Sequence, residues 1–407
     1  MAFSVFMWLA QTLGLLCAAL GALLVAVVVK RLFFGPLSQI PGPKLAAVSN
    51  IWYAYHAKNG TTATLGKWLH RRYGPAVRVG PNEVWFDSKE AYDIIYSTGV
   101  RGYEKSDFYL ATALARPQVD QYLNVHFKDN LDLLSEMDMH RYRLQRRLIG
   151  RVYRTANVVR HEAAIDSAMD AAVAALEVMG DTQLDLKEWM HIIAVECLGT
   201  MVLSWSPGML KSGTDRDTSN QSYLGWRRKS VFGLFPLITK LEVNHRWIGR
   251  VWGTLWGVTY QTPKGFKPFF PDVSRKVGRR IKNKSNPAAG DQREDLMTDL
   301  VNLHNDKPDF TELYLRKMAV TNFGAGHETL ASTLTAVIAM LGQHPEVQAT
   351  AREEIREARI RKRDNPNKNE KKKKKEKETR KKTKEKTQKY EAFTYAEALE
   401  LEYTRAV

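Results

Sequence analysis

The N-terminal segment differs from the rest of the chain in its pattern of polar and apolar positions. From Ala2 to Val29 there is no charged residue, and most positions are Leu, Ala, Val, Phe or Gly. A helix of this length can cross a hydrocarbon core of about 30 Å. Lys30 and Arg31 follow at once, whereas a signal peptide carries its basic residues before a shorter apolar core. The pattern therefore predicts a retained single-pass anchor with its downstream side in the cytosol.

The remainder of the chain has the pattern of a globular body that is mainly helical. Residues 30–48 form a proline-containing linker with a stiff turn at "IPGP". Residues 76–88 alternate apolar and polar positions around a Gly-Pro-Asn turn, which predicts a β-hairpin. Helical spacing predicts helices at 61–74, 88–97, within 140–203, within 206–265, and at 294–306, 311–343 and 344–358. We therefore expect a mainly α fold with a small β-sheet, and a helical domain that spans residues 49–358.

A lysine-rich segment, residues 359–389, holds most of the positive charge. It contains 17 Lys or Arg and 5 Asp or Glu, so 12 of the net charge of +17 falls there. Such charge without apolar content predicts a solvated, disordered insertion, after which residues 390–407 resume the domain. Attraction to anionic lipid or nucleic acid is an alternative, and a non-native coding segment is a third. No aromatic residues interleave the lysines, so we expect no nucleic-acid partner.

The longest predicted helix, 311–343, contains "NFGAGHETLAS", whose polar and flexible residues interrupt an apolar pattern. Gly324 and Gly326 each cost about 1 kcal/mol relative to Ala in a helix interior. Close packing of another helix is the common reason for such glycines. Clearance for a flat ligand over the helix backbone is the alternative.

The acid and hydroxyl that follow these glycines suggest chemistry. The hydroxyl of Thr329 can bond the carbonyl of Ala325, four residues back, and can loosen the helix there. Glu328 places a titratable group beside that hydroxyl, which makes the pair suited to proton delivery. A solvent-facing or ion-paired Glu328 is the simpler interpretation.

At this point the residues carry a resemblance to a known family. "AGHET", Ala325–Thr329, matches the [Ala/Gly]-Gly-x-[Asp/Glu]-Thr pattern of the cytochrome P-450 family of heme-thiolate monooxygenases. The segments "IPGP", "RYGPAVRVGPNEVWF", "HRYRLQRRLIGRVY" and "LGQHPEVQATAREEI" resemble further family elements in family order. The chain also resembles fungal members near benzoate and pisatin-type hydroxylases.

The resemblance implies a heme b cofactor, electrons from an NADPH-dependent reductase and transfer of one oxygen atom into a substrate. It implies catalytic roles for Thr329, which would hydrogen-bond the oxygen at the iron, and for Glu328, which would relay protons. Ala325 and Gly326 would line the groove over the heme face. In membrane-anchored members the globular part faces the cytosol from the endoplasmic reticulum membrane, which we expect here.

A basic helix near residue 145 is the expected binding element for the heme propionates. The family places an aromatic residue or His four positions before an Arg, and Tyr142 and Arg146 have this spacing. His140 is a rival for the first role, and Arg143 and Arg147 are rivals for the second. A cation that donates to a propionate is a sound charge-assisted pairing, although a solvated basic face is the simpler interpretation.

The irregular region 99–137 would form part of the substrate cavity. Its aromatic residues Tyr103, Phe108 and Tyr109 suit a small apolar or aromatic substrate, and ordinary packing is the alternative role for each of them.

The chain departs from the family pattern at its end. "FTYAEALELEYTRAV" resembles the lead-in to the Glu-x-x-Arg helix, but that motif and the Cys-containing heme loop are not among the 407 residues. Cys17 lies in the apolar segment and Cys197 in an apolar helix. No cysteine pair has zinc-ligand spacing, and we predict no metal ligand. We therefore expect a truncated, inactive monooxygenase. The alternative is a non-catalytic, membrane-anchored remnant or binding protein.

Overall fold

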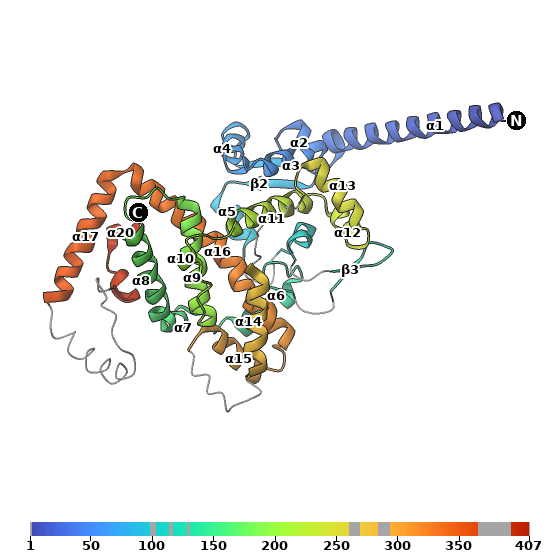
Figure 1. Ribbon diagram of the computed structural model, residues 1–407. Coiled ribbons are helices and arrows are strands. Elements are labelled where there is room, and N and C mark those ends of the chain that lie inside the picture. The colour runs from blue at the N-terminus through green and yellow to red at the C-terminus, as the bar shows by residue number, and fades with distance from the viewer. Residues whose placement is uncertain are drawn as a thin grey trace. The chain divides into compact units, whose positions relative to one another are not determined.

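The computed structural model describes residues 2–97, 103–113, 117–127, 131–259, 269–283, 294–364 and 392–406 (Figure 1). The chain divides into two compact units. Unit 1 comprises residues 1–144 and 223–261, and unit 2 comprises residues 145–222 and 262–407. The predicted fold class is confirmed, because helices dominate and the strands form two small antiparallel sheets.

Unit 1 begins with α1 (Ala2–Val29), the long blue helix in Figure 1, and the short π-helix η1 (Lys30–Phe34). By length and composition this helix could cross a membrane. The other elements of unit 1 are α2 (Lys44–Val48), α3 (Ile51–Lys58), α4 (Thr62–Tyr73), β1 (Ala76–Gly80), β2 (Glu83–Phe86), α5 (Lys89–Ile95), η2 (Asp107–Thr112), β3 (Gln118–Val119), β4 (Val125–His126), α12 (Pro236–Asn244) and α13 (Arg246–Trp256). Two helices cross the division between the units, α6 (Met139–Ile149) and α11 (Thr218–Gly233).

The proline turn after η1 packs closely on β1. The Arg78 amide donates to the carbonyl of Pro41 over 2.8 Å. A Cβ added to Gly42 would lie 2.2 Å from the Arg78 carbonyl oxygen, so only glycine permits this approach. The buried Arg78 guanidinium donates to the carbonyls of Arg31 at 2.8 Å and Pro81 at 2.9 Å. The linker is therefore bound to the domain at this point.

The predicted hairpin is confirmed as β1 and β2. Val77 and Val79 point into a small core with Leu65 and Leu69 of α4. This is the outcome expected when alternate residues of a strand share one face. Ser88 caps α5, since its side chain accepts a hydrogen bond from the amide of Ala91.

All the regular secondary-structure elements described in unit 2 are helices. Its elements are α7 (Thr155–Val158), η3 (Val159–His161), α8 (Glu162–Met179), α9 (Leu186–Leu203), α10 (Met209–Ser212), α14 (Phe269–Asn283), α15 (Leu296–Asp306), α16 (Glu312–Gln343), α17 (Pro345–Asp364), α19 (Tyr395–Ala398) and α20 (Glu402–Ala406). The helices predicted at 294–306, 311–343 and 344–358 are confirmed.

The structure corrects the predicted start of the lysine-rich segment. α17 continues past residue 358 to Asp364, so the first part of the segment is helical. Arginine and lysine are good helix formers, and Lys362 donates to the Ala392 carbonyl at 2.9 Å and to Glu397 at 3.0 Å. These contacts hold the last turn against the C-terminal residues. The prediction of disorder for residues 365–389 lies outside the described residues.

The core of unit 2 forms where α9 lies beside α16 (Figure 1). Most residues of α9 from Trp189 to Gly199 are buried, which fits its nearly continuous apolar run. The buried residues of α16 recur every three or four positions along one side of the helix: Tyr314, Leu315, Met318, Ala319, Phe323, His327 and Ala331. These buried residues define the covered side of α16.

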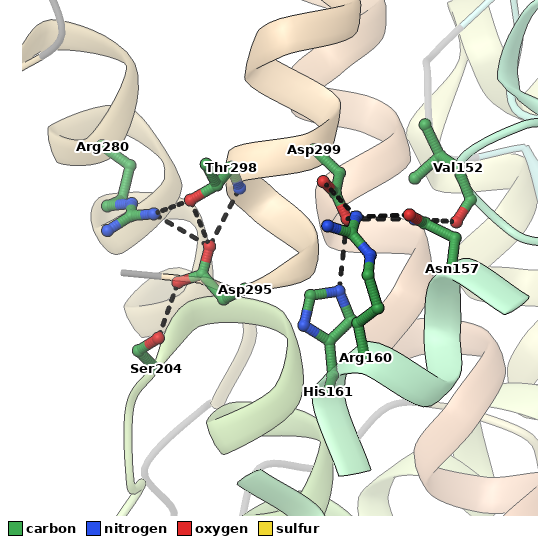
Figure 2. Close-up of polar contacts among 9 residues, drawn as sticks. All are labelled: Val152, Asn157, Arg160, His161, Ser204, Arg280, Asp295, Thr298 and Asp299. Carbon is green, nitrogen blue, oxygen red and sulfur yellow. Dashed lines mark hydrogen bonds and ion pairs between the residues drawn. The ribbon is translucent and has the colours of Figure 1, made fainter. Parts of the chain in front are cut away.

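Asp295 caps α15 and binds α15 to two other helices (Figure 2). Its carboxylate accepts from the Thr298 amide at 2.9 Å and from the Arg280 guanidinium of α14 at 2.9 Å. It also accepts at 2.8 Å from the hydroxyl of Ser204, the residue that ends α9. Ser204 has a φ of 46°, a left-handed conformation that is uncommon for serine, and this bond holds it there.

Asp299, one turn along α15, binds the segment before α8 (Figure 2). It accepts from Asn157 at 3.0 Å and from Arg160 at 3.1 Å, and His161 Nε2 lies 3.2 Å away. The two carboxylates therefore join α15 to α7–η3, α9 and α14 with charge-assisted hydrogen bonds.

Replacement of Asp295 tests this arrangement. Asp295→Ala removes a cap and leaves the Arg280 guanidinium, which is 10% exposed, without its carboxylate. We expect a loss of about 3–5 kcal/mol in the free energy of unfolding, because a buried ion pair is broken. Urea unfolding of the detergent-solubilised chain, followed by circular dichroism, measures this value. Glu312→Ala breaks the exposed pair with Arg316 and should cost at most about 1 kcal/mol. Equal effects of the two substitutions would contradict the interpretation.

Candidate functional site

One side of α16 is open and carries small residues and hydroxyls. Ala325, Thr329 and Thr333, spaced four residues apart, are all exposed. The Thr329 hydroxyl donates to the Ala325 carbonyl over 2.6 Å, which confirms the predicted bond. The Thr333 hydroxyl repeats this pattern onto the Thr329 carbonyl at 2.9 Å. The helix runs uninterrupted from Glu312 to Gln343 through these bonds, so the expected loosening does not break it.

The two glycines of the motif have different surroundings. A Cβ added to Gly326 would lie 2.8 and 2.9 Å from the two methyl groups of Leu198 on α9. Gly326 therefore permits close packing of α9 on α16, the common reason for a helix glycine. An added Cβ on Gly324 would meet nothing within 4 Å. A role of Gly326 in lining a heme groove stays a prediction.

Glu328 lies at the border of the buried side of α16. It is half-buried, whereas Thr329 beside it is exposed. A carboxylate oxygen of Glu328, a ring nitrogen of His191 and a ring nitrogen of His327 all lie within 4.8 Å of one another. The Glu328 carboxylate, which the sequence places beside the Thr329 hydroxyl, thus has the two imidazoles of His191 and His327 as neighbours.

The two histidines are nearly inaccessible to solvent. His191 of α9 and His327 of α16 are each 1% exposed, and their ring centroids lie 5.2 Å apart. Burial, and secondarily the neighbouring His191, lower the pKa of His327 to about 3, because both disfavour its charged form. His327 is therefore neutral at pH 7.

A carboxylate lies behind His191. Asp215 Oδ2 is 3.3 Å from His191 Nδ1, and it accepts from the Ser219 amide at 2.8 Å. Burial alone would raise the pKa of Asp215, but the contacts with His191 and Ser219 outweigh it and hold that pKa well below its usual range. Asp215 is thus an anion beside the His191 ring.

The predicted propionate residues lie on α6. Tyr142 belongs to unit 1, where Lys105 Nζ lies 4.8 Å from its ring centroid. Arg146 belongs to unit 2 and is exposed in the last turn of α6. His140 is exposed at the start of α6, and its amide donates to Asp138 at 2.8 Å. The structure thus brings Glu328, Thr329, Ala325 and Gly326 together on α16, and the propionate roles stay predictions.

The two cysteines have the surroundings expected of structural residues. Cys197 is buried in α9 against Trp189, Ile193 and their neighbours. Burial, followed by the nearby Glu196 charge, raises the pKa of the Cys197 thiol to about 11, so it stays protonated at neutral pH. Cys197 therefore offers no thiolate for a metal. Cys17 lies in α1.

Unit 1 contains a cavity of about 920 Å³. Leu110, Val119 and Phe232 supply apolar walls, and Arg228 and Arg246 add cationic groups. Residues of the region 99–137, among them Leu110 and Val119, line part of this cavity, and a role of the region in substrate binding stays a prediction. Its aromatic residues, however, are not among the described lining residues: Phe108 instead packs on Gly233, Lys105 lies over the ring of Tyr109, and Tyr103 is exposed.

The sequence analysis did not single out His191, His327 and Asp215. A signal was present for the histidines, since each interrupts an apolar run at a position that faces the core. Asp215 lies in a loop between α10 and α11, and no local pattern distinguishes it.

The contrast between the glycines of α16 can be tested. Gly324→Ala should raise the free energy of unfolding by about 0.5–1 kcal/mol, because alanine reduces the entropy lost on folding and meets no neighbour. Gly326→Ala should lower it by about 1–3 kcal/mol, because the methyl group overlaps Leu198. Urea titration compares both variants with the unaltered chain. A stabilising Gly326→Ala would show that the α9–α16 contact tolerates a side chain there.

Comparisons with known proteins agree with the motif. The family model of cytochrome P450 matches residues 41–374. The chain is 54% identical to the cytochrome P450 monooxygenase sdnT of Sordaria araneosa, over 81% of this chain and 62% of that protein. It is 26% identical to a pisatin demethylase of Fusarium vanettenii, over 79% of this chain and 59% of that protein. The chain thus spans about three fifths of the length of these curated relatives. The resemblance to fungal, pisatin-type members is confirmed, and the chain belongs to the cytochrome P450 family, whose cofactor is heme.

Proposed function

We propose that this chain supplies the distal side of a heme-dependent monooxygenase that inserts one oxygen atom of O2 into a small apolar or aromatic substrate. The observation that carries the proposal is the open side of α16. There, exposed Ala325 and Thr329 lie beside Glu328 in the motif of the family.

The residues of this side fit one face of a heme. Ala325 is small, and the Thr329 hydroxyl turns back to the Ala325 carbonyl, so neither side chain stands out from the helix. Arg146 is an exposed cation suited to a propionate, and Tyr142 is its proposed partner on α6. When held by a cysteine thiolate, heme supplies the activation of oxygen. Cys17 and Cys197 do not supply that thiolate, so the proposal assigns this chain the distal residues only.

The proton chemistry of this side comes from Thr329 and Glu328. The Thr329 hydroxyl now donates to the Ala325 carbonyl, and rotation about its Cα–Cβ bond would aim the same proton toward the open side. Glu328 can hold a proton on its carboxylate and return it, which is the role of a general acid beside a hydroxyl.

The cavity of unit 1 supports an apolar substrate with a polar substituent. Leu110, Val119 and Phe232 can exclude water from an apolar body. Arg228 is paired with Glu242 at 2.9 Å, whereas Arg246 is exposed at the cavity and can orient a polar group.

The apolar helix α1 supports anchoring in the endoplasmic reticulum membrane, with the globular part in the cytosol. Lys30 and Arg31 at its C-terminal end favour that orientation. A cytosolic body in turn suits an NADPH-dependent reductase as the electron donor.

The heme ligand provides the first test. We expect the 407-residue chain, mixed with hemin, reduced and treated with carbon monoxide, to show no Soret band of thiolate-ligated heme, because its cysteines offer no thiolate. The same chain extended by a segment with a Phe-x-x-Gly-x-x-x-Cys loop should show that band, and a Cys→Ser change in the loop should abolish it. A thiolate band from the 407-residue chain itself would contradict the assignment of its cysteines. Failure of the extended chain to bind heme would favour a non-catalytic, membrane-anchored binding protein.

The extended chain also tests Thr329. We expect Thr329→Val to lower the rate of product formation by about 10²-fold, since proton delivery by a positioned group contributes at least that much. Thr329→Ser keeps the hydroxyl and serves as the matched control. Product formation and NADPH consumption are measured together with a panel of apolar and aromatic substrates. Equal rates for the Val and Ser variants would remove Thr329 from the proton path.

A further inference from the structure

A second cluster of chemically reactive groups lies on the covered side of α16, away from the exposed Ala325 and Thr329. His191 comes from α9, and His327 and Glu328 come from α16. The three side chains can each bring one ligand atom within 4.8 Å of the others. The contact between the two helices brings the cluster together, so it forms only in the folded unit.

Several ring nitrogens in this cluster lack a hydrogen-bond partner. Within the described residues, Nδ1 and Nε2 of His191 and Nε2 of His327 are buried and have no hydrogen-bond partner. Buried polar atoms of native proteins nearly always have a partner, and each exception needs an explanation. The two Nε2 atoms, which lie beside a half-buried carboxylate, indicate a shared ligand.

We propose that His191, His327 and Glu328 form a binding site for a divalent transition-metal ion of the zinc type. Two imidazoles and one carboxylate are a common ligand set for Zn²⁺, with the fourth position left to water. Imidazole ligands favour Zn²⁺, Cu²⁺ or Ni²⁺ over Mg²⁺ and Ca²⁺, which prefer oxygen. Metal binding at these residues does not require heme, although the sequence pattern predicts no metal ligand.

The surroundings of His191 suit this role. Asp215 Oδ2 lies 3.3 Å from His191 Nδ1 without a hydrogen bond between them, and a small rotation of the ring would let Nδ1–H donate to this carboxylate and leave the lone pair of Nε2 free for a cation. This carboxylate–histidine–metal arrangement is the usual way in which a protein fixes a ligating imidazole.

His327 and Glu328 need a small adjustment. The Glu328 amide donates to His327 Nδ1 at 2.7 Å, so binding through Nε2 moves the ring proton to Nδ1 and gives up this contact. The loss of one neutral hydrogen bond is small beside three bonds to a divalent ion. Zinc bonds of about 2.0–2.2 Å also require the ligand atoms to move closer. Glu328 is the least buried of the three and has the longest side chain, so it can make most of that movement.

Occupation of this site would compete with the proposed proton relay, because both use Glu328. That consequence rests on the proposed function, whereas metal binding itself does not. The test therefore measures binding and not oxidation, so that the two proposals can fail separately.

Metal binding can be measured on the 407-residue chain, purified in detergent without a histidine tag and treated with a chelator. Calorimetric titration with Zn²⁺ should give one ion per chain, and Co²⁺ should show the visible bands of a tetrahedral site. Glu328→Gln should weaken binding by at least about tenfold, and Asp215→Asn by about 10–100-fold, the usual effect of a partner behind a ligand. His191→Gln and His327→Gln should each abolish it.

His161→Gln is the matched control. His161 is also a buried histidine beside a carboxylate, with Nε2 3.2 Å from Asp299, but it lies outside the cluster. The His161→Gln substitution should leave Zn²⁺ binding unchanged. Circular dichroism identifies any variant that fails to fold. If a histidine variant fails to fold, the affinity of Glu328→Gln and the Co²⁺ spectrum of the unaltered chain decide whether the metal site exists. No binding to the folded chain, or binding that Glu328→Gln leaves unchanged, would overturn the proposal.

Discussion

The close contact between α9 and α16 is the constraint on which the candidate site depends. Gly326 makes it possible, because the methyl groups of Leu198 occupy the space where any other residue would place its Cβ. Protein interiors are closely packed and leave little free volume, so this one position sets how near α9 and α16 lie to each other. Their separation then determines that the stripe from Tyr314 to Ala331 is covered and that Ala325 and Thr329 are not.

The same contact accounts for the polar groups inside unit 2. His191 and His327 can meet only because the helices that carry them touch, and Asp215 reaches His191 from the loop that follows α10. On α15, Asp295 and Asp299 hold the surrounding helices with short charge-assisted bonds (Figure 2). Buried charges are costly when unpaired. Unit 2 therefore combines an apolar stripe with a few polar contacts whose partners come from distant parts of the chain.

Local patterns predict those features that depend on neighbouring residues. The hairpin around Pro81 pairs residues at most ten positions apart, and the bond from Thr329 to Ala325 spans four positions; both are present. The pairing of His191 with His327 is different, because it depends on which helices pack together and in which register. The end of α17 was misjudged for a related reason: composition indicated disorder, but Lys362 binds residues that follow the segment.

The five-residue motif therefore presents two surfaces on two sides of one helix. Ala325 and Thr329 form an open surface that suits a flat cofactor, while Gly326 and His327 face α9. Glu328 lies between them, near the Thr329 hydroxyl in sequence and near two imidazoles in space. A helix turns by about 100° per residue, so consecutive residues necessarily point to different neighbours. The chemistry of Glu328 is therefore set by the covered side of α16 as much as by the open side, where the family motif is usually interpreted.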